Sequence, residues 1–416
     1  MQWLLIGYMF LFIDRPFEVW PILGDIHLER IYFLGMIGYW LIFANKTLPL
    51  SRVHSALLAF ASALLISWSL SRWPGSGQPI VENWLKILAF YALIVTSVRD
   101  VQGLRFLVWG FVGSVFLYEV HSLREYLGGR HTYRMGIVRM LGVDDTQGDP
   151  NSFGATVLFA LPFAILLYQT TTHRLAKFYY VGFSLLTFTC IGLTGSRSSF
   201  LGLSIWLMIE VFRSRHRWLA LSACIMLAPV GFQLLPESLQ TRFETIISPE
   251  VGPESARESS EGRLIGLSQG VDLFLDNPFS GCGPGAWRPA THSLIESHNL
   301  YGQVIGELGA LGALAFLILL LIYFLEIRKI RSAAAWEISD RLSFPKKLAE
   351  AVGLSLFLLL LEGNFGHNLY RYNWLWYATF LVIARRCSMV SNVASEFDTG
   401  QIPLAENESE IESILE

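Results

Sequence analysis

Residues 308–325 read LGALGALAFLILLLIYFL, a run of eighteen residues without one charged side chain. A helix of about 20 apolar residues spans the hydrocarbon core of a bilayer, whereas a helix of a soluble protein carries a polar face. Apolar runs of similar length recur along most of the 416-residue chain. The sequence therefore predicts an all-α integral membrane protein, and it excludes a soluble enzyme and a disordered or collagen-like chain.

The composition agrees with this class of protein. Hydrophobic residues make up 53% of the chain and charged residues only 16%, compared with about 25% charged residues in an average soluble domain. The four cysteines are too few for a disulfide framework. The formal net charge of −3 is unevenly distributed, because the residues after Arg386 include seven acids and no base. We expect residues 387–416 to form an acidic, disordered cytoplasmic tail.

About twelve segments have the apolar character of membrane-spanning helices. They lie near residues 2–13, 31–44, 54–70, 82–98, 104–119, 153–169, 176–193, 198–212, 217–235, 298–325, 350–361 and 368–386. Three transmembrane parts precede the tail: N-terminal helices (1–139), a central part (140–325) that contains a large external loop (236–297), and C-terminal helices (326–386).

The positions of the basic residues orient these helices. Five of the six lysines fall in one set of alternate connections, or just beyond a span on that side, and the basic residues of the opposite connections are all arginines. Because basic residues accumulate in cytoplasmic loops, we place the lysine-bearing side and both termini in the cytoplasm. Two long segments, 120–152 and 236–297, are then external. Apolar helical patches in the second, such as Leu264 to Phe274, predict that it folds over the membrane.

The first of four polar clusters on the external side opens the span at 153–169. It reads Asp149-Pro150-Asn151-Ser152-Phe153-Gly154. Asp149 is a natural N-cap, and proline suits the first helical position. A capped helix start accounts for this cluster without any further role.

The second cluster is a short turn, Thr194-Gly195-Ser196-Arg197-Ser198-Ser199. A cation at a helix N-terminus opposes the helix dipole, so stability is a poor reason for Arg197. An arginine binds phosphate oxygens in a two-point geometry, and the N–H groups of a helix N-terminus also favour an anion. The alternative is an arginine that extends to the membrane interface.

The third cluster lies in the large loop. Glu261-Gly262-Arg263 is followed by Asn277-Pro278 and by the glycine-rich run Gly281-Cys282-Gly283-Pro284-Gly285. This run lacks the spacing and the lysine of a nucleotide-binding P-loop, so it predicts a turn-rich return to the membrane. Taken alone, Arg263 is equally consistent with a solvated loop residue.

The fourth cluster opens the span at 298–325. His298 can act as a base near neutral pH, or it can simply bond a neighbour. Asn299, Gln303 and Glu307 recur at intervals of four and form a polar ridge, which is costly within a membrane and usually functional. Gly302, Gly306 and Ala310 form a ridge of small residues where another helix can approach closely.

Other polar positions rank lower. Glu82 and Lys86 are spaced to pair within one helix. The residues Arg124, Arg130, Arg134 and Arg139 make the first external segment basic, which suits phosphate groups. The turn between the last two spans contains Glu362, Asn364, His367, Asn368, Tyr370 and Arg371, and with its Trp and Tyr residues it is typical of an interfacial belt.

No cluster has the spacing of a metal site, and we expect neither a metal nor another cofactor. Two arginines and a histidine instead suit an activated diphosphate leaving group. The guanidinium groups would neutralise the diphosphate while the histidine activates an incoming hydroxyl.

These motifs, in this order and between these spans, resemble the O-antigen ligase/polymerase family of bacterial envelope glycosyltransferases. The resemblance covers roughly residues 140–325 and carries five motifs: Asp149–Gly154, Thr194–Arg197, Gly262-Arg263, Asn277-Pro278 with Gly281–Gly285, and His298-Asn299 with Glu307. It implies a glycosyltransferase-C-like, metal-independent enzyme of the bacterial inner membrane that acts on the periplasmic face. The reaction would transfer a glycan, with inversion, from an undecaprenyl-diphosphate donor to a hydroxyl of a glycan, lipid or protein acceptor; no nucleic-acid partner is implied.

Carried over by motif, Arg197 and Arg263 would hold the diphosphate and His298 would be the base. The remaining polar residues would bind or orient the substrates: Asp149, Asn151, Asn299, Gln303 and Glu307. The motifs leave open whether the enzyme is a ligase or a polymerase. Two other classes of function stay open as well, a transporter or flippase of polyprenyl-linked sugars and a non-catalytic scaffold for envelope assembly. A transporter would need broken helices and repeated halves, which the sequence does not reveal.

Overall fold

The computed structural model describes residues 1–398 apart from 45, 135–136, 146–147, 245–253, 294–295 and 333–342; for 134, 254–264, 343 and 390–398 it describes the backbone. The elements run in the order α1 (Gln2–Asp14), α2 (Pro16–Val19), α3 (Pro21–Asp25), α4 (Leu28–Phe43), α5 (Arg52–Leu70), α6 (Pro74–Ser97), α7 (Val101–Leu127), β1 (His131–Arg134), β2 (Ile137–Met140), α8 (Pro150–Thr170), α9 (Arg174–Thr194), α10 (Arg197–Arg213), α11 (Arg217–Gln233), α12 (Glu237–Glu244), α13 (Glu254–Asp276), α14 (Trp287–Thr291), α15 (Leu300–Arg331), α16 (Ser343–Glu362) and α17 (Asn373–Asp398).

Each of the predicted spans coincides with a helix, namely α1, α4 to α11 and α15 to α17. Within the described residues, six of these helices (α5 to α9 and α15) have both the length and the hydropathy of a membrane span. The α1 and α11 helices are apolar but shorter. A multi-pass helical membrane protein is therefore confirmed, whereas the number of twelve crossings is not.

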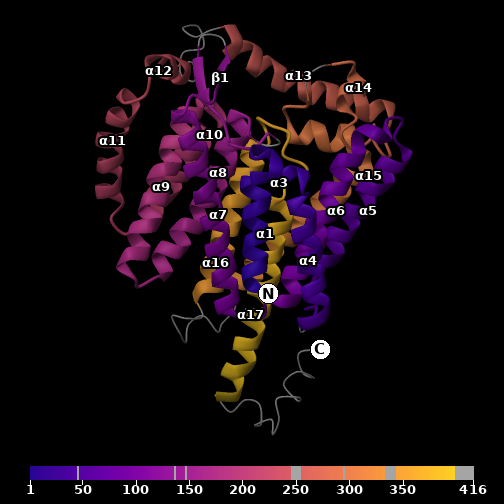
Figure 1. Ribbon diagram of the computed structural model, residues 1–416, viewed down its shortest axis with the longest axis vertical. Helices are drawn as coiled ribbons and strands as arrows, with labels where there is room; N and C mark the ends of the chain where they lie inside the picture. Colours follow the sequence, from indigo (N-terminus) through magenta and orange to yellow (C-terminus); the bar gives the residue numbers. More distant parts are fainter. Residues whose placement is uncertain are drawn as a thin grey trace.

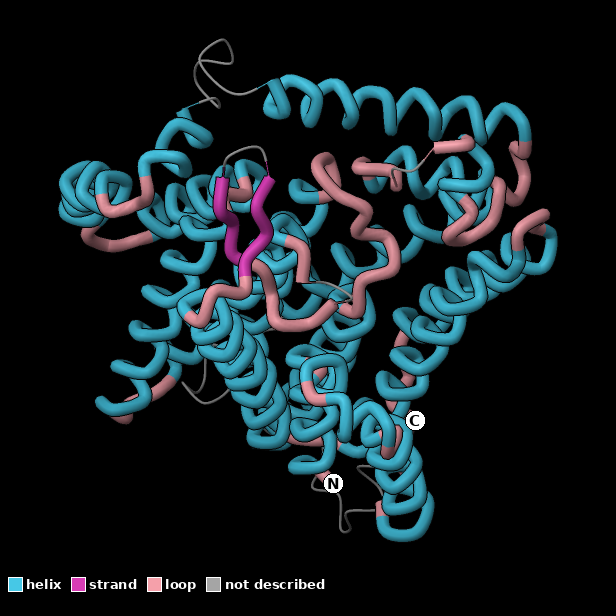
Figure 2. The backbone as a smooth tube through the Cα atoms, turned by 45° about the horizontal axis from the view of Figure 1, so that its top comes forward, coloured by secondary structure: helices cyan, strands magenta, loops and turns pink. Residues whose placement is uncertain are grey.

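The helices form a bundle with three groups (Figure 1). On one side α15 packs against α5, and α5 against α6. On the other side α8 packs against α9 and α10, and α1, α7, α16 and α17 lie between the two groups. The α13 helix crosses one end of the bundle, as Figures 1 and 2 both show. This placement confirms that the large loop folds over the bundle.

One continuous hydrophobic core joins all three transmembrane parts of the chain, from Leu5 through Phe153 to Trp376. The α8 helix is the most enclosed of the six spans, with 78% of its apolar window buried. The α11 helix has no buried residue and lies at the left edge of Figure 1. An apolar helix with no buried residue is suited to a lipid environment, which agrees with a membrane protein.

A short hairpin is the one departure from the all-α prediction among the described residues. β1 and β2 pair antiparallel, with His131 opposite Met140 and Arg134 opposite Ile137. The β-branched and aromatic residues of these strands favour extended backbone, but strands of four residues are too short to stand out in the sequence.

The tail was predicted to start at residue 387, which is earlier than the end of the last helix. α17 continues through residues 387–398, where we expected disorder, and the side chains of Cys387 and Ser388 are buried. The helix continues because contacts with the bundle extend past Arg386, and Cys387 bonds to the carbonyl group of Arg99. Residues 399–416 lie outside the described part of the chain.

Candidate active site at the outer end of the bundle

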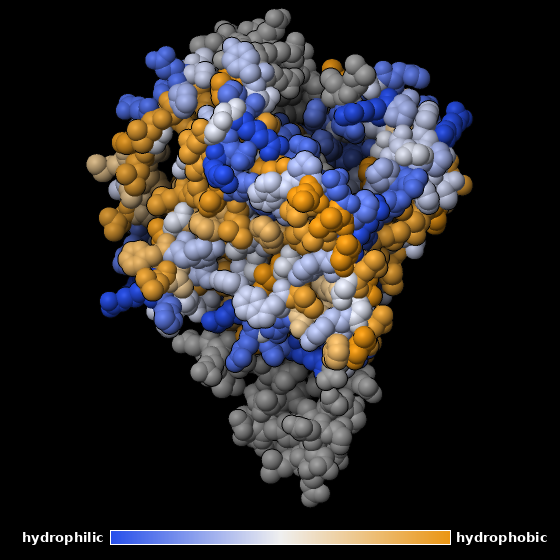
Figure 3. Space-filling model, in the orientation of Figure 1, coloured by the Kyte–Doolittle hydropathy of each residue, from blue (hydrophilic) through white to orange (hydrophobic). Residues whose placement is uncertain are grey.

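The end of the bundle that carries α12, α13, α14 and the hairpin is here called the outer end. Figure 3 shows hydrophilic side chains gathered at this end around a hollow, while hydrophobic side chains cover much of the flanks. The polar clusters predicted from the sequence meet here. Their contacts define a candidate active site.

Asp149 caps α8. Its Oδ1 accepts hydrogen bonds from the backbone N–H groups of Asn151 at 3.1 Å and Ser152 at 3.3 Å, as the sequence predicted. The side chains of Asp149 and Asn151 are both exposed, so solvent reaches them at the outer end. The cap is confirmed, and the substrate-binding roles of these two residues remain predictions.

Arg139 connects the first two polar clusters. Its Nη2 donates to Oδ1 of Asn151 at 3.0 Å, and its Nε donates to the backbone carbonyl of Thr194 at 2.7 Å. The side chain is 4% exposed, so this arginine of the first external segment is a buried connection and not part of an exposed basic surface for phosphates. Helix packing brings the same clusters together, because a Cβ on Gly154 would lie 2.7 Å from Oγ of Ser199.

Arg197 is the first residue of α10 and is half-buried. The turn before it bends through Gly195, which has a φ of 59°, and Ser196 caps the helix by accepting from the N–H of Ser199. A second guanidinium lies against the same turn, because Nε of Arg242 in α12 donates to the carbonyl of Gly195 at 2.7 Å. The sequence did not single out Arg242, whose position depends on the folding of the large loop.

His298 lies beside a second histidine. The rings of His298 and His367 are 5.9 Å apart between centroids and tilted by 43°. His367 is exposed, yet the protein atoms around its ring contribute to lowering its pKa to about 4, with desolvation as the largest cause and the charges of His298, Arg371 and Arg288 as further causes. Asp149 acts in the opposite direction, which places the first and fourth clusters within electrostatic reach of one imidazole.

Arg371 fixes the turn that carries His367. Its Nη2 donates to the carbonyl of Ser152 at 2.9 Å and to Oγ1 of Thr156 at 3.2 Å, both in the first turns of α8. Its Nη1 is buried and has no hydrogen-bond partner among the described residues. The interfacial-belt interpretation, which concerned the Trp and Tyr residues at this turn, is wrong for Trp374 and Trp376, because both are buried in the core. This turn was ranked lower from the sequence, although an arginine and a histidine in a short turn between two apolar spans are a pattern that could have indicated a site.

The glycine-rich loop inserts its backbone into a break in α15. At Gly309, with φ 62° and ψ −160°, the helix opens. The N–H groups of Ala310 and Leu311 then donate to the carbonyls of Pro278 and Phe279, at 2.8 and 3.1 Å. In return the loop donates from Cys282 and Gly283 to the carbonyls of Gly306 and Glu307, both at 2.9 Å. Irregular backbone inside a membrane protein is stable only when its polar groups are satisfied in this way.

Only glycine fits at the centre of this insertion. A Cβ on Gly281 would lie 2.4 Å from the carbonyl carbon of Glu307, and the φ of Gly281 is 67°. Any side chain there would clash with the main chain of α15. Gly281 is therefore explained by close packing of backbone on backbone, whereas a Cβ on Gly283 would first meet the side chain of Ser71, at 2.3 Å.

The polar ridge of α15 is buried. Asn299 caps the helix by accepting from the N–H groups of Tyr301 and Gly302, at 2.9 and 3.0 Å. Glu307 is fully buried, and its Oε2 accepts from the hydroxyl of Tyr370 at 2.6 Å and from the N–H of Gly285 at 3.0 Å. Its Oε1, like Oε1 of the buried Gln303, has no partner among the described residues.

These contacts give Glu307 a clear structural role, because it joins the glycine-rich loop to the outer turn before α17. The carboxylate also raises the pKa of Tyr370 above its ordinary range, although burial of the phenol is the larger cause. Substrate binding by Asn299, Gln303 and Glu307 remains a prediction.

The ridge of small residues has the partner helix that it requires. α13 crosses α15, and a Cβ on Gly270 would lie 2.5 Å from the carbonyl oxygen of Gly302. Gly306 meets the same helix, which confirms close approach at these two positions. A Cβ on Gly266, one helical turn from Gly270, would lie 3.5 Å from the backbone N of His298. Arg263 lies in α13 three residues before Gly266, and its side chain is outside the described part of the structure.

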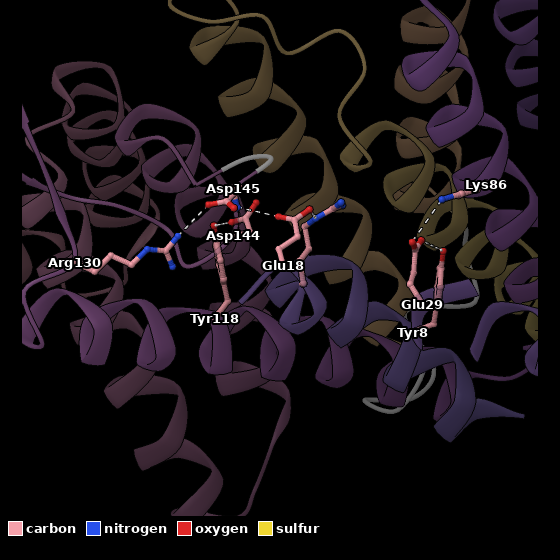
Figure 4. Close-up of polar contacts among 9 residues, drawn as sticks. Tyr8, Glu18, Glu29, Lys86, Tyr118, Arg130, Asp144 and Asp145 are labelled. Carbon is pink, nitrogen blue, oxygen red and sulfur yellow. Dashed lines mark hydrogen bonds and ion pairs between the residues drawn. The ribbon is translucent and has the colours of Figure 1, made fainter. Parts of the chain in front are cut away.

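One wall of the outer end is a network between α2 and the segment before α8 (Figure 4). Arg130 pairs with Asp145 at 3.2 Å, and the backbone N–H of Asp145 donates to Glu18 at 2.9 Å. The hydroxyl of Tyr118 donates to the buried carboxylate of Asp144. Arg130 is therefore also part of a structural network and not an isolated basic residue.

The predicted pairing of Glu82 with Lys86 within one helix is wrong. Lys86 pairs with Glu29 of α4 at 3.5 Å, and the hydroxyl of Tyr8 donates to the same carboxylate at 3.2 Å (Figure 4). Glu82 accepts from the side chain of Gln78 instead. Lys86 pairs with Glu29 because α4 packs beside α6, and the sequence alone does not reveal this packing.

The fold defines a multi-pass helical membrane protein, and residues of the predicted polar clusters lie at its outer end. Residues 182–317 match the family model described as O-antigen ligase, which confirms the resemblance drawn from the motifs. The matched segment contains Arg197, Arg263, His298 and Glu307, whereas Asp149 precedes it. No curated protein matches the chain.

Proposed function

We propose that the protein is a metal-independent, inverting membrane glycosyltransferase that transfers a glycan from an undecaprenyl-diphosphate donor to an acceptor hydroxyl, as an O-antigen ligase or polymerase does. The observation that carries this proposal is the convergence at the outer end. His298 lies beside His367, and His367 lies within electrostatic reach of Asp149, Arg288 and Arg371. The family match of residues 182–317 supports the same class of reaction.

In the proposed reaction, His298 accepts the proton of the acceptor hydroxyl. The hydroxyl oxygen attacks the anomeric carbon of the donor glycan, and the bond between that carbon and the phosphate oxygen breaks. The electron pair leaves with the diphosphate, whose charge Arg197 and Arg263 neutralise. Attack from the face opposite the leaving group inverts the anomeric configuration.

The two histidines have different proposed roles. We assign the proton transfer to His298, because it lies within the matched segment 182–317 whereas His367 lies outside it. His367, whose ring lies beside that of His298, would position the His298 ring. Two adjacent imidazoles also disfavour double protonation, which keeps one of them neutral.

The proposed location is the inner membrane of a bacterium, with the site on the periplasmic face and both termini in the cytoplasm. The distribution of lysines supports this orientation. The N-terminus lies at the end of the bundle opposite α13 in Figure 1, as this orientation requires. The acceptor is a glycan, a lipid or a protein, and the proposal does not select among them.

The break in α15 favours one alternative, a flippase or transporter of lipid-linked sugars, because such proteins use interrupted helices. Here the N–H groups of Ala310 and Leu311 at the break bond to the inserted loop. Since the break is filled by the chain itself, we consider glycan transfer the better proposal.

Purified protein in lipid vesicles, supplied with undecaprenyl-diphosphate glycan and an acceptor, tests the proposal. Mass spectrometry should detect a new glycosidic bond with the unmodified protein, and no product with Arg263→Ala or His298→Ala. His292→Asn is a matched control, because His292 is exposed, lies six residues from His298 and has a φ of 52° that asparagine tolerates. Movement of the donor across the membrane without a new bond would support the transporter, and equal product from all variants would overturn the proposed mechanism.

A further inference from the structure

A pocket of about 560 Å³ opens at the inner end of the bundle, opposite the candidate active site. It lies where α7 begins, α8 ends and α9 begins, and its polar and aromatic lining includes Gln102, Arg105, Trp109, Thr170, Thr171 and Tyr180. The 21-residue helix α8 separates it from Asp149 by about 30 Å, since a helix rises 1.5 Å per residue. The pocket is therefore a distinct site.

Arg105 is a half-buried cation in this pocket. Its Nη1 donates to the carbonyl of Thr170 at 3.2 Å, and its guanidinium lies 4.8 Å from the ring centroid of Phe344. In the described parts of the chain no carboxylate pairs with it. An arginine has five N–H donors, so most of them remain for water or a ligand. A half-buried guanidinium without a carboxylate partner favours an anionic ligand such as phosphate.

The other walls of the pocket suit the headgroup and the adjoining first acyl carbons of a lipid. Trp109 is 38% exposed, and Trp3 packs edge-on against it at 6.3 Å between centroids. Tryptophan residues of this kind concentrate at membrane interfaces. Gln102 and Thr171 add polar groups at the mouth of the pocket, and Lys177 lies close by, with its ammonium 5.4 Å from the ring of Tyr168.

We propose that this pocket binds the phosphate of an anionic phospholipid headgroup, with Arg105 as the principal phosphate ligand. The guanidinium provides the two-point geometry that phosphate oxygens accept, and the aromatic wall borders the first carbons of the acyl chains. The lipid would connect α7 to the ends of α8 and α9. Because it binds the folded protein, it would raise the temperature of unfolding.

Native mass spectrometry of the full-length protein in neutral detergent tests this site, with phosphatidylglycerol, phosphatidylcholine and inorganic phosphate as separate probes. Phosphatidylglycerol should bind about tenfold or more tightly than phosphatidylcholine, and Arg105→Gln should abolish that preference. Arg213→Gln is the matched control, because Arg213 is exposed and neither it nor its partner Glu350 lines this pocket.

A second variant keeps the test valid if Arg105→Gln folds poorly. Gln102 is exposed, so Gln102→Glu should leave the fold intact while it places a carboxylate at the mouth of the pocket and repels the phosphate. Phosphatidylglycerol should raise the midpoint of thermal unfolding of the unmodified protein but not of Gln102→Glu. An unchanged preference in both variants would overturn the proposal. Binding of inorganic phosphate as tightly as phosphatidylglycerol would overturn its assignment to a lipid.

Discussion

The two ends of the bundle hold their basic residues in different ways. At the inner end, carboxylates pair with cations: Glu350 contacts Arg213 at 2.8 Å and Arg331 at 3.5 Å, and Glu326 contacts Lys329 at 3.2 Å. Around the candidate active site, Arg139, Arg242 and Arg371 each donate to a neutral backbone carbonyl, although ion pairs also occur at this end, such as Arg288 with Glu296 at 2.9 Å. A neutral acceptor positions an arginine without cancelling its charge.

Three arginines follow this pattern around the site. Arg139 donates to Thr194, Arg242 to Gly195 and Arg371 to Ser152, in each case to a carbonyl oxygen. Each of these hydrogen bonds also fixes the turn at which a helix of the site begins or ends. These hydrogen bonds hold three arginines at the end where we propose that an anionic diphosphate binds, whereas Glu350 at the inner end joins α16 to α10 and α15 through ion pairs.

The largest expected effect is at Arg197. Replacement by alanine should lower glycan transfer by about 10²–10³-fold, the range observed when a group that stabilises developing negative charge is removed. Arg197→Lys should recover only part of the rate, because an ammonium lacks the two-point geometry of guanidinium. Initial rates in vesicles measure both effects. Arg124→Ala, which removes an exposed arginine from the outer end of α7, should leave the rate unchanged.

The second largest effect is expected at Arg371. Its replacement tests whether hydrogen bonds to neutral acceptors position the residues of the site. Arg371→Gln should lower the free energy of unfolding by about 1.5–3 kcal/mol, since a charged donor to Ser152 and Thr156 is lost. Transfer should fall by about tenfold or more, because the turn that carries His367 is no longer fixed to α8.

Arg385 is the matched residue at the inner end, where it pairs with Glu326 at 3.8 Å. Arg385→Gln should change thermal stability slightly and transfer not at all. An equal loss of transfer in Arg385→Gln and Arg371→Gln would contradict the distinction between the two ends.

Asn151 allows the charge itself to be changed. Asn151→Asp converts the neutral acceptor of Arg139 into a carboxylate. Arg139 would then form an ion pair, like the pairs at the inner end of the bundle. The KM for the lipid-linked donor should rise by about fivefold and depend more weakly on salt, because the local positive potential is reduced. Asn151→Ala removes the acceptor without adding charge, and it should have the smaller effect on KM.

The smallest effect concerns pH and His367. Its pKa of about 4 lies below the ordinary 6.5, so between these values the unfolded state binds more protons than the folded state. This residue therefore contributes to a loss of stability as the pH falls from 6.5 toward 4. The melting temperature of His367→Gln should decrease less than that of the unmodified protein over this window. Parallel melting curves would argue against a desolvated imidazole.

Much of the helical framework could be predicted from apolar runs, because membrane spans need little information beyond length and hydropathy. The cap at Asp149 and the close approach at Gly302 and Gly306 were also predictable, since each depends on local geometry. The break at Gly309 was not. The sequence around it reads as a continuous apolar helix, and the break depends on a loop that comes from about thirty residues earlier.

The second histidine escaped prediction for a related reason. His367 follows His298 by 69 residues, with a helix on either side of residues 333–342 between them. Only the packing of α16 against α15 and α8 brings the two rings together. For Arg139 the prediction from sequence was wrong. Its segment is basic, which suggested exposed phosphate ligands, but the side chain is buried and donates to the carbonyl of Thr194.

The central claim is that the outer end is a site of glycan transfer with His298 as base. The most direct measurement is single-turnover transfer by purified protein in vesicles with a metal chelator present, from a donor of known anomeric configuration, with the product analysed by NMR. We predict a product of inverted configuration from the unmodified protein and a rate about 10²–10⁴-fold lower from His298→Ala. A product of retained configuration, or an unchanged rate in His298→Ala, would contradict the account.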